Sequence, residues 1–153
     1  MLVDFVLAPD GRSALVVDDS DDLTVYDLSE RRVRAQLRSG TVSYRTPTFS
    51  PDGRHIAVVR FARSCWITPE CDDHAVEVLD ANSLQRVASY EGFGPAADLV
   101  FSPDGRYLAA AGPVAWLPPK DNLAVWRVAN DPVGPVRLTL PHPGADLRAM
   151  PES

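Results

Sequence analysis

The residues Ser-Pro-Asp-Gly-Arg occupy positions 50–54 and again positions 102–106, and Ala-Pro-Asp-Gly-Arg occupies positions 8–12. Each copy lies between two apolar runs. The prolines of the three copies are 42 and 52 residues apart. A nearly identical motif that recurs at such intervals is typical of a repeat protein, in which each repeat forms one structural unit.

Each copy of the motif is predicted to be a hairpin turn. Proline fixes φ, the aspartate side chain can accept a hydrogen bond from its own backbone, and glycine allows positive φ. The run that follows each turn is strongly apolar: residues 14–17 read ALVV, residues 56–59 read IAVV and residues 108–111 read LAAA. Runs without alternation are typical of strands that are covered on both faces. The first two strands of each repeat are therefore expected to be antiparallel neighbours.

Two further strands are predicted in each repeat. The third strand reads LTVYD at 23–27, VEVLD at 76–80 and LAVWR at 123–127, with apolar residues at alternate positions. This period of two indicates a strand. The fourth strand alternates with arginine at 33–37 and 136–140, which suits an exposed edge. Repeats of about 40–50 residues with four strands are typical of propeller blades.

The predicted fold class is all-β, a partial β-propeller of three four-stranded antiparallel blades plus the first strand of a fourth. We place blade 1 at about 2–38, blade 2 at about 45–91 and blade 3 at about 96–141, within one domain that covers residues 1–153. Residues 145–152 align without a gap to residues 97–104. We therefore expect a fourth blade to begin at about 145–153.

These motifs resemble those of the WD-repeat β-propeller family, whose blades carry a Phe-Ser-Pro-Asp-Gly turn and end the third strand in Trp-Asp. Residues 49–53 and 101–105 match that turn. The third strands end here in Tyr-Asp, Leu-Asp and Trp-Arg, and the family's Gly-His pair is missing. The Tol-type and lactonase-like propellers share the turn and are also similar. The resemblance covers nearly the whole chain and implies a propeller fold.

Composition excludes several classes of partner. The chain is 45% hydrophobic and 24% charged, which is typical of a soluble globular protein. No apolar run approaches the roughly 18 residues that a membrane span requires. The net charge of −6 and the pI of 4.9 provide no basic stripe for phosphates. We expect no membrane or nucleic-acid partner, and the lack of a signal peptide pattern predicts a cytoplasmic location.

Two insertions between the second and third strands share a sequence signature. In blade 2 it consists of Trp66, Ile67 and Pro69, and in blade 3 of Trp116, Leu117 and Pro119. Binding residues collect on loops that a rigid sheet supports, and tryptophan is enriched at interface hot spots. The two tryptophans are predicted to emerge on neighbouring blades as a docking patch for a protein partner. Alternatively, each indole packs against its own loop or the adjacent blade.

A polar residue recurs five positions before each turn proline: Asp4, Thr46, Asp98 and Asp146. On the predicted strands these residues lie at the channel end of the innermost strands, on the tryptophan face. A ring of such carboxylates would attract a cation or an arginine-rich partner. The alternative is that each carboxylate accepts hydrogen bonds from neighbouring backbone.

Two other groups of residues carry side chains of the types that bind metal ions. Asp18, Asp19, Asp21 and Asp22 lack the glycine and the distal glutamate of an EF-hand loop, so a solvated turn is favoured. Cys65, Cys71 and His74, with His55 across the hairpin, have the residue types of a zinc site but not its usual Cys-x-x-Cys spacing. Reduced thiols or a disulfide between the two cysteines are the alternatives.

No catalytic motif is found. The chain has no Gly-x-Ser-x-Gly elbow and no phosphate-binding Gly-x-x-x-x-Gly-Lys sequence. The leading hypothesis is a non-catalytic interaction module without a cofactor, which binds a protein through its loop face. Its ring would be completed either by a second copy or by further blades of a longer polypeptide. The alternative is a ligand-binding, metal-binding or enzymatic propeller of the lactonase or Tol type.

Overall fold

The computed structural model describes residues 2–63, 73–91, 98–112, 123–128 and 136–138. These residues form three separate four-stranded antiparallel sheets, and they contain no α-helix. In each sheet the strands are hydrogen-bonded in the order of the sequence. The predicted all-β fold with three propeller blades is therefore confirmed for the described residues. The predicted start of a fourth blade, at 145–153, lies outside them.

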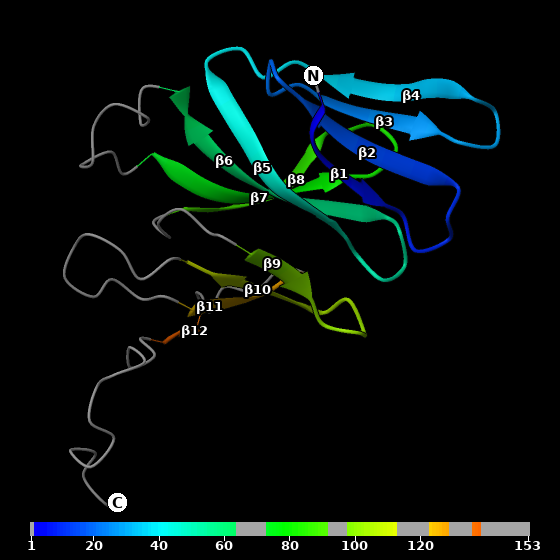
Figure 1. The fold of residues 1–153 in the computed structure, drawn as a ribbon. Coiled ribbons are helices and arrows are strands. Elements are labelled where there is room, and N and C mark those ends of the chain that lie inside the picture. The colour runs from blue at the N-terminus through cyan, green and yellow to red at the C-terminus, as the bar shows by residue number, and fades with distance from the viewer. Residues whose placement is uncertain (1, 64–72, 92–97, 113–122, 129–135, 139–153) are drawn as a thin grey trace, which may run out of the picture.

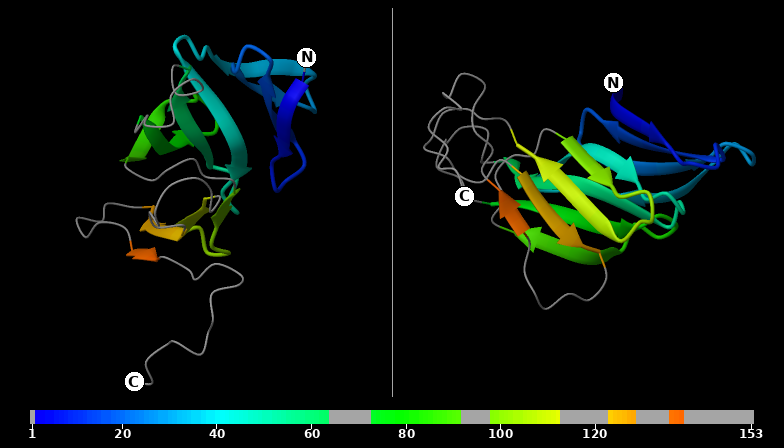
Figure 2. Two further views of the ribbon diagram at one scale, coloured as in Figure 1. Left: turned by 60° about the vertical axis from the view of Figure 1, so that its left-hand side comes forward. Right: turned by 90° about the horizontal axis from the view of Figure 1, so that it is seen from below.

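The three sheets follow one another along the chain and lie side by side (Figures 1 and 2). Their strands are, for blade 1, β1 (Leu2–Leu7), β2 (Ser13–Asp18), β3 (Leu23–Asp27) and β4 (Arg32–Leu37); for blade 2, β5 (Val42–Phe49), β6 (His55–Ala62), β7 (His74–Asp80) and β8 (Arg86–Glu91); and for blade 3, β9 (Asp98–Phe101), β10 (Tyr107–Ala111), β11 (Leu123–Arg127) and β12 (Val136–Leu138). The first strand of blade 2 contacts the first strands of both other blades, as the innermost strands of a propeller do.

The Pro-Asp-Gly turns adopt the predicted geometry. In blade 2 the amide of Gly53 donates to the carbonyl of Ser50 at 2.9 Å, with φ of +70° at the glycine. Asp52 Oδ1 accepts from the amide of Arg54 at 3.0 Å and from Ser50 Oγ at 2.6 Å. Blade 3 repeats all these contacts. The turns join the first and second strands of each blade and lie at the right-hand edge of Figure 1.

The apolar core lies between the blades. We call the face that a blade turns toward the preceding blade its front face, and the face toward the following blade its rear face. Between blades 1 and 2, the rear residues Leu15 and Val17 belong to one buried cluster with the front residues Ile56 and Val58. A second cluster fills the space between blades 2 and 3. Its fully buried members include Ala57, Val78, Leu108, Ala110 and Ala124.

The second strands differ in how completely they are covered. Four consecutive residues of β6, Ile56 to Val59, are buried, because blade 2 has a neighbour on each face. In β10 only alternate residues are buried, although its sequence is as apolar as that of β6. The prediction of burial on both faces is thus wrong for β10, because no described residue covers its rear face. The fourth strands β4 and β8 contain no buried residue, as expected for strands at an exposed edge.

Candidate interaction surfaces

The two insertions with the tryptophan signature begin and end on paired strands. In blade 2, Phe61 pairs with His74, and the amide of Ala62 donates to the carbonyl of Asp73 at 3.2 Å. In blade 3, Ala111 pairs with Leu123. These strand ends lie at the left of Figure 1, opposite the Pro-Asp-Gly turns. Trp66, Ile67 and Pro69, and Trp116, Leu117 and Pro119, lie outside the described residues.

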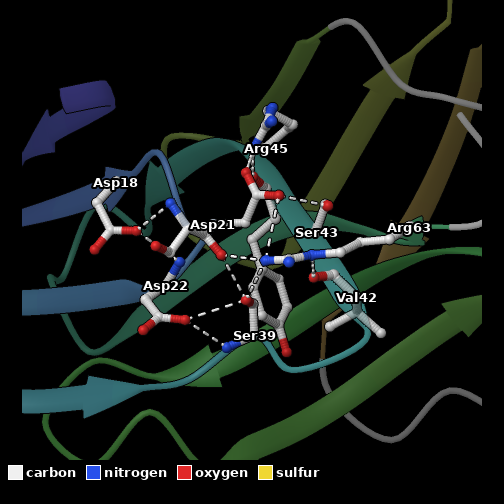
Figure 3. A network of polar contacts seen from close by, with 10 residues as sticks. Asp18, Asp21, Asp22, Ser39, Val42, Ser43, Arg45 and Arg63 are labelled. Carbon is white, nitrogen blue, oxygen red and sulfur yellow. Dashed lines mark hydrogen bonds and ion pairs between the residues drawn. The ribbon is translucent and has the colours of Figure 1, made fainter. Parts of the chain in front are cut away.

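Arg63 fixes the first of these insertions to the rest of the molecule. Its Nε donates to the carbonyl of Val42 at 3.2 Å, and its Nη2 donates to Ser39 Oγ at 3.0 Å. Nη2 also donates to the carbonyl of Ser20 in the β2–β3 loop of blade 1. Arg63, at the start of the insertion, is therefore bonded both to the connection between blades 1 and 2 and to the neighbouring blade (Figure 3).

Asp21 is the centre of this polar network. Its carboxylate accepts from Ser43 Oγ at 2.6 Å and forms an ion pair with Arg45, and Arg63 lies 3.8 Å away. Asp21 lies in the β2–β3 loop of blade 1, whereas Ser43 and Arg45 lie on β5 of blade 2. The residue is only 8% exposed and its φ is +64°. The network therefore joins two blades at the edge from which the insertions leave.

The other aspartates of this loop bind backbone and hydroxyl donors. Asp18 Oδ1 accepts from the amides of Ser20 and Asp22, at 2.9 and 3.1 Å. Asp22 Oδ1 accepts from the amide and the hydroxyl of Ser39. The interpretation of residues 18–22 as a solvated turn is wrong for Asp21, which is buried because its charge is compensated by arginines from the next blade. Sequence reasoning had no signal for this pairing, because the partners lie 24 and 42 residues away.

A second charged cluster lies on the front face of blade 2. Glu77 is buried, and its Oε1 lies 3.1 Å from Arg60 Nε and 3.3 Å from Arg86 Nη1. Arg60 also bonds Asp73 at 3.0 Å. Burial raises the pKa of the nearby Tyr44, and the charge of Glu77 adds to the rise. One feature of the sequence could have predicted this cluster. Glu77 stands between two valines in the third strand, and a buried glutamate at such a position requires a compensating cation.

The predicted ring of carboxylates is only partly within the described residues. Asp4 is half-buried on β1 and accepts from the amide of Phe5 at 2.8 Å, and Asp98 is exposed at the start of β9. Thr46, with φ of +56°, lies in the irregular part of β5, between these two strands. Asp146 lies outside the described residues. No group of three or more histidine, cysteine, aspartate or glutamate side chains among the described residues is arranged to hold a metal ion.

The structure does not bring together the residues of the candidate zinc site. Cys65 and Cys71 lie outside the described residues, and the ring of His74 stacks on Phe61 at 6.0 Å between centroids. His55 pairs with Asp80 at the other end of the β6–β7 ladder. Phe61 lies six positions further along the extended strand, or about 20 Å away. The expectation that His55 lies beside His74 is wrong, because the hairpin aligns it with the third-strand end.

Two sheet faces carry apolar residues that no described residue covers. On the front face of blade 1, Phe5, Leu7 and Tyr26 are all more than a third exposed. On the rear face of blade 3, Val100 and Tyr107 are exposed, and the β10–β11 pair Ala109 and Val125 is half-buried. Isolated exposed apolar residues are common, but contiguous apolar faces indicate an interaction surface.

Comparison with solved structures identifies the fold. A structure of the eukaryotic initiation factor is similar over 90% of this chain, with a TM-score of 0.66 and 19% identity. Dihydro-heme d1 dehydrogenase NirN in complex with DHE is similar over 91%, with a TM-score of 0.65 and 22% identity. The C-terminal WD40 domain of Sif2 is similar over 71%, with a TM-score of 0.54 and 17% identity. The fold is that of β-propeller blades, and one of these similar structures is a WD40 domain.

This chain covers only 33%, 28% and 30% of those three chains, respectively. No protein-family model matches the sequence, and neither does any curated protein. Among the described residues there is no helix of the length and hydropathy that crossing a bilayer requires.

Proposed function

We propose that this chain is a non-catalytic propeller module that binds a protein partner through the edge bearing the two insertions. The observation that carries the proposal is the placement of their bases: the β6–β7 and β10–β11 strand ends are paired, and they lie on neighbouring blades at one edge of the molecule. Loops that leave a rigid scaffold side by side are suited to binding. Each of these loops carries a tryptophan followed by an aliphatic residue and a proline.

The polar network supports the same conclusion. A docking surface keeps its shape only if the blades that bear it do not move relative to each other. Asp21, Arg45 and Arg63 join blades 1 and 2 directly beneath the first insertion. Because Asp21 is buried, this ion pair is less screened by salt than a surface pair is. These contacts therefore restrain blades 1 and 2 relative to each other at the strand ends that carry the first insertion.

The test is partner capture with the double variant Trp66→Ala/Trp116→Ala. Proteins retained by the wild-type chain are identified by quantitative mass spectrometry, and the retained partner is then purified and titrated by calorimetry. Two hot-spot tryptophans cost about 2 kcal/mol or more each when truncated, so the affinity should fall by roughly 1000-fold. The matched control is Leu28→Ala, which removes an exposed apolar side chain from the β3–β4 turn at the opposite edge. Equal affinity of the double variant and the wild type would reject the docking role.

A ligand-binding, metal-binding or enzymatic propeller of the lactonase or Tol type is the alternative. It draws support from the similarity to a dehydrogenase structure, although 22% identity reports on the fold alone. Thermal denaturation in the presence of calcium, magnesium or zinc separates the two proposals. Stabilisation by one of these ions that disappears in Asp98→Asn would favour the alternative, whereas no shift with any ion favours the interaction module.

A further inference from the structure

The two uncovered sheet faces are the two halves of one blade junction. In both junctions that the structure describes, the rear face of one blade packs on the front face of the next. Within the part of the chain that the structure describes, nothing covers the front face of blade 1 or the rear face of blade 3. Blade 2 lies between them, so the two faces cannot meet within one chain.

The front face of blade 1 carries the residues of a buried junction face. Leu7 precedes the first turn at the position that Phe49 and Phe101 hold in the other blades. Phe49 and Phe101 are 8% and 7% exposed because a preceding blade covers them, whereas Leu7 is 55% exposed. Tyr26 corresponds in the same way to two buried residues, Leu79 and Trp126. This face has the composition of a junction without its neighbour.

The rear face of blade 3 has the complementary composition. Val100, Ala109 and Val125 correspond to Val6, Leu15 and Val25 of blade 1. Leu15 and Val25 are completely buried against blade 2, and Val6 packs on the same cluster. The residues that form this face in blade 3 are therefore apolar where a following blade is required, and they are uncovered in the described structure.

The turns show the same missing neighbour. Cβ atoms built on Gly53 and Gly105 would contact the prolines of the preceding blade, Pro9 and Pro51. A Cβ on Gly11 would meet nothing within 4 Å. Pro103 is exposed and is the corresponding proline of blade 3. Gly11 and Pro103 are thus the unused partners of a third such contact.

Polar side chains at the margins of the open faces also match those of an existing junction. In the first junction, Arg34 on β4 of blade 1 donates to Asn82 in the β7–β8 turn of blade 2 at 3.4 Å. In blade 3, Arg127 lies on the rear side of β11 and is exposed. The corresponding turn of blade 1 contains Glu30. A cation on the open rear face would therefore lie near the carboxylate of this turn, which forms an ion pair with Arg32 within its own blade.

From these observations we infer that two copies of this chain close head to tail into one ring, in which blade 3 of each copy packs on blade 1 of the other. Two such junctions would cover both of these faces in each copy and would bring the six blades that two copies of the described residues form into one ring. Closure distinguishes this arrangement from a head-to-tail filament. The inference does not depend on the proposed loop-face partner, because the insertions leave from an edge and not from a sheet face.

The test is the mass of the purified chain in solution, measured by sedimentation equilibrium. The wild type should have twice the chain mass of 16.7 kDa. Tyr26→Glu on the front face and Val100→Glu on the rear face should each yield monomers, since each variant places an unpaired charge in both junctions. The matched control is Val87→Glu: Val87 is 56% exposed on β8, Val100 is 58% exposed, and only Val100 lies on an open face. Val87→Glu should remain dimeric.

A second pair of variants changes only exposed charges and does not endanger folding. Arg127→Glu removes one exposed ion pair from each of the two junctions and should raise the dimer dissociation constant by roughly two- to thirty-fold. Adding Glu30→Arg in the same chain should restore the dissociation constant of the wild type.

A wild-type monomer at all concentrations would overturn the inference, as would a mass beyond two copies. Loss of the dimer in only one of Tyr26→Glu and Val100→Glu would show that like faces pair, which also overturns it. Trp66→Ala/Trp116→Ala should leave the mass unchanged, so the two proposals fail separately.

Discussion

Pro51 faces Gly105 across the junction between blades 2 and 3, where a Cβ on the glycine would lie 3.8 Å from Cδ of the proline. Pro9 and Gly53 have the same relationship across the junction between blades 1 and 2, at 3.9 Å. The motif that forms each hairpin therefore also contacts the same motif in the next blade. One short sequence has two roles, because its proline presents a compact ring and its glycine has no side chain.

The glycine is required by its backbone conformation rather than by the contact. Gly105 has φ of +71° and Gly11 has φ of +69°, but only Gly105 has a proline beside it. A distance of 3.8 Å is ordinary van der Waals contact. We expect Gly105→Ala and Gly11→Ala to reduce the free energy of unfolding by similar amounts, about 1 kcal/mol each. Urea denaturation measures both. A much greater loss for Gly105→Ala would show that the contact between turns is tighter than the structure indicates.

Loss of the charge at Asp21 should weaken the packing between blades 1 and 2. Asparagine tolerates the positive φ of this position, so Asp21→Asn removes the ion pairs with little backbone strain. The side chains of Arg45 and Arg63 are 28% and 46% exposed, which reduces the penalty below that of a fully buried pair. We expect a loss of about 1–3 kcal/mol in the free energy of unfolding. Faster amide hydrogen exchange in β5 should accompany it.

The matched control for Asp21→Asn lies in the same loop. Ser20 contributes its backbone carbonyl to the network, and Ser20 itself is exposed to solvent. Ser20→Ala should therefore change the free energy of unfolding by less than about 0.5 kcal/mol. An equal loss in both variants would contradict a specific role for the Asp21 carboxylate.

The hairpins were predictable because the information for them is local. Proline, aspartate and glycine at adjacent positions specify the turn, and the apolar runs on either side specify the strands. The order of strands in each sheet followed from four short strands joined by short connections. The Asp21 network was not predictable in this way, because it depends on how two blades pack. The expectation for His55 was wrong for a similar reason. The position of His55 relative to His74 follows from the register of β6 and β7, and its distance in sequence from Cys65 does not determine it.

The candidate site was less accessible to sequence reasoning than the fold. Residues 66 and 116 were selected by a shared pattern, and the structure describes the strands that support them but not the residues themselves. The open faces were expected from the number of repeats. Which side chains form them required the structure, since Val16 and Leu15 are adjacent in β2 but point to opposite sides of the sheet.

Trp126 should contribute more to the junction between blades 2 and 3 than any hydrogen bond there. It is buried and its ring stacks on Tyr90, with 5.1 Å between centroids and an interplanar angle of 19°. Trp126→Ala should cost about 3–5 kcal/mol of unfolding free energy. Tyr90→Phe keeps the stacked ring and removes only the 3.2 Å bond to the carbonyl of Arg127, at a cost of about 1 kcal/mol or less. Thermal denaturation compares them, and equal costs would contradict a packing role for the indole.

Acid should weaken the fold through Asp27, at the end of β3. The backbone amide of Glu30 holds the pKa of this carboxyl well below its usual value, and Arg34 and Ser29 lower it further. A carboxyl with a lower pKa in the folded chain than in the unfolded chain stabilises the fold above its unfolded pKa of about 3.9, and this contribution is lost as the pH falls below that value. The free energy of unfolding of Asp27→Asn should therefore depend less on pH between about 4 and 2 than that of the wild type.

Ser29→Ala keeps the carboxylate and loses only the hydroxyl donor, so it should retain most of the acid dependence. Urea denaturation across this range measures all three proteins, and an equally steep pH dependence in Asp27→Asn would assign the acid sensitivity to the other turn carboxylates.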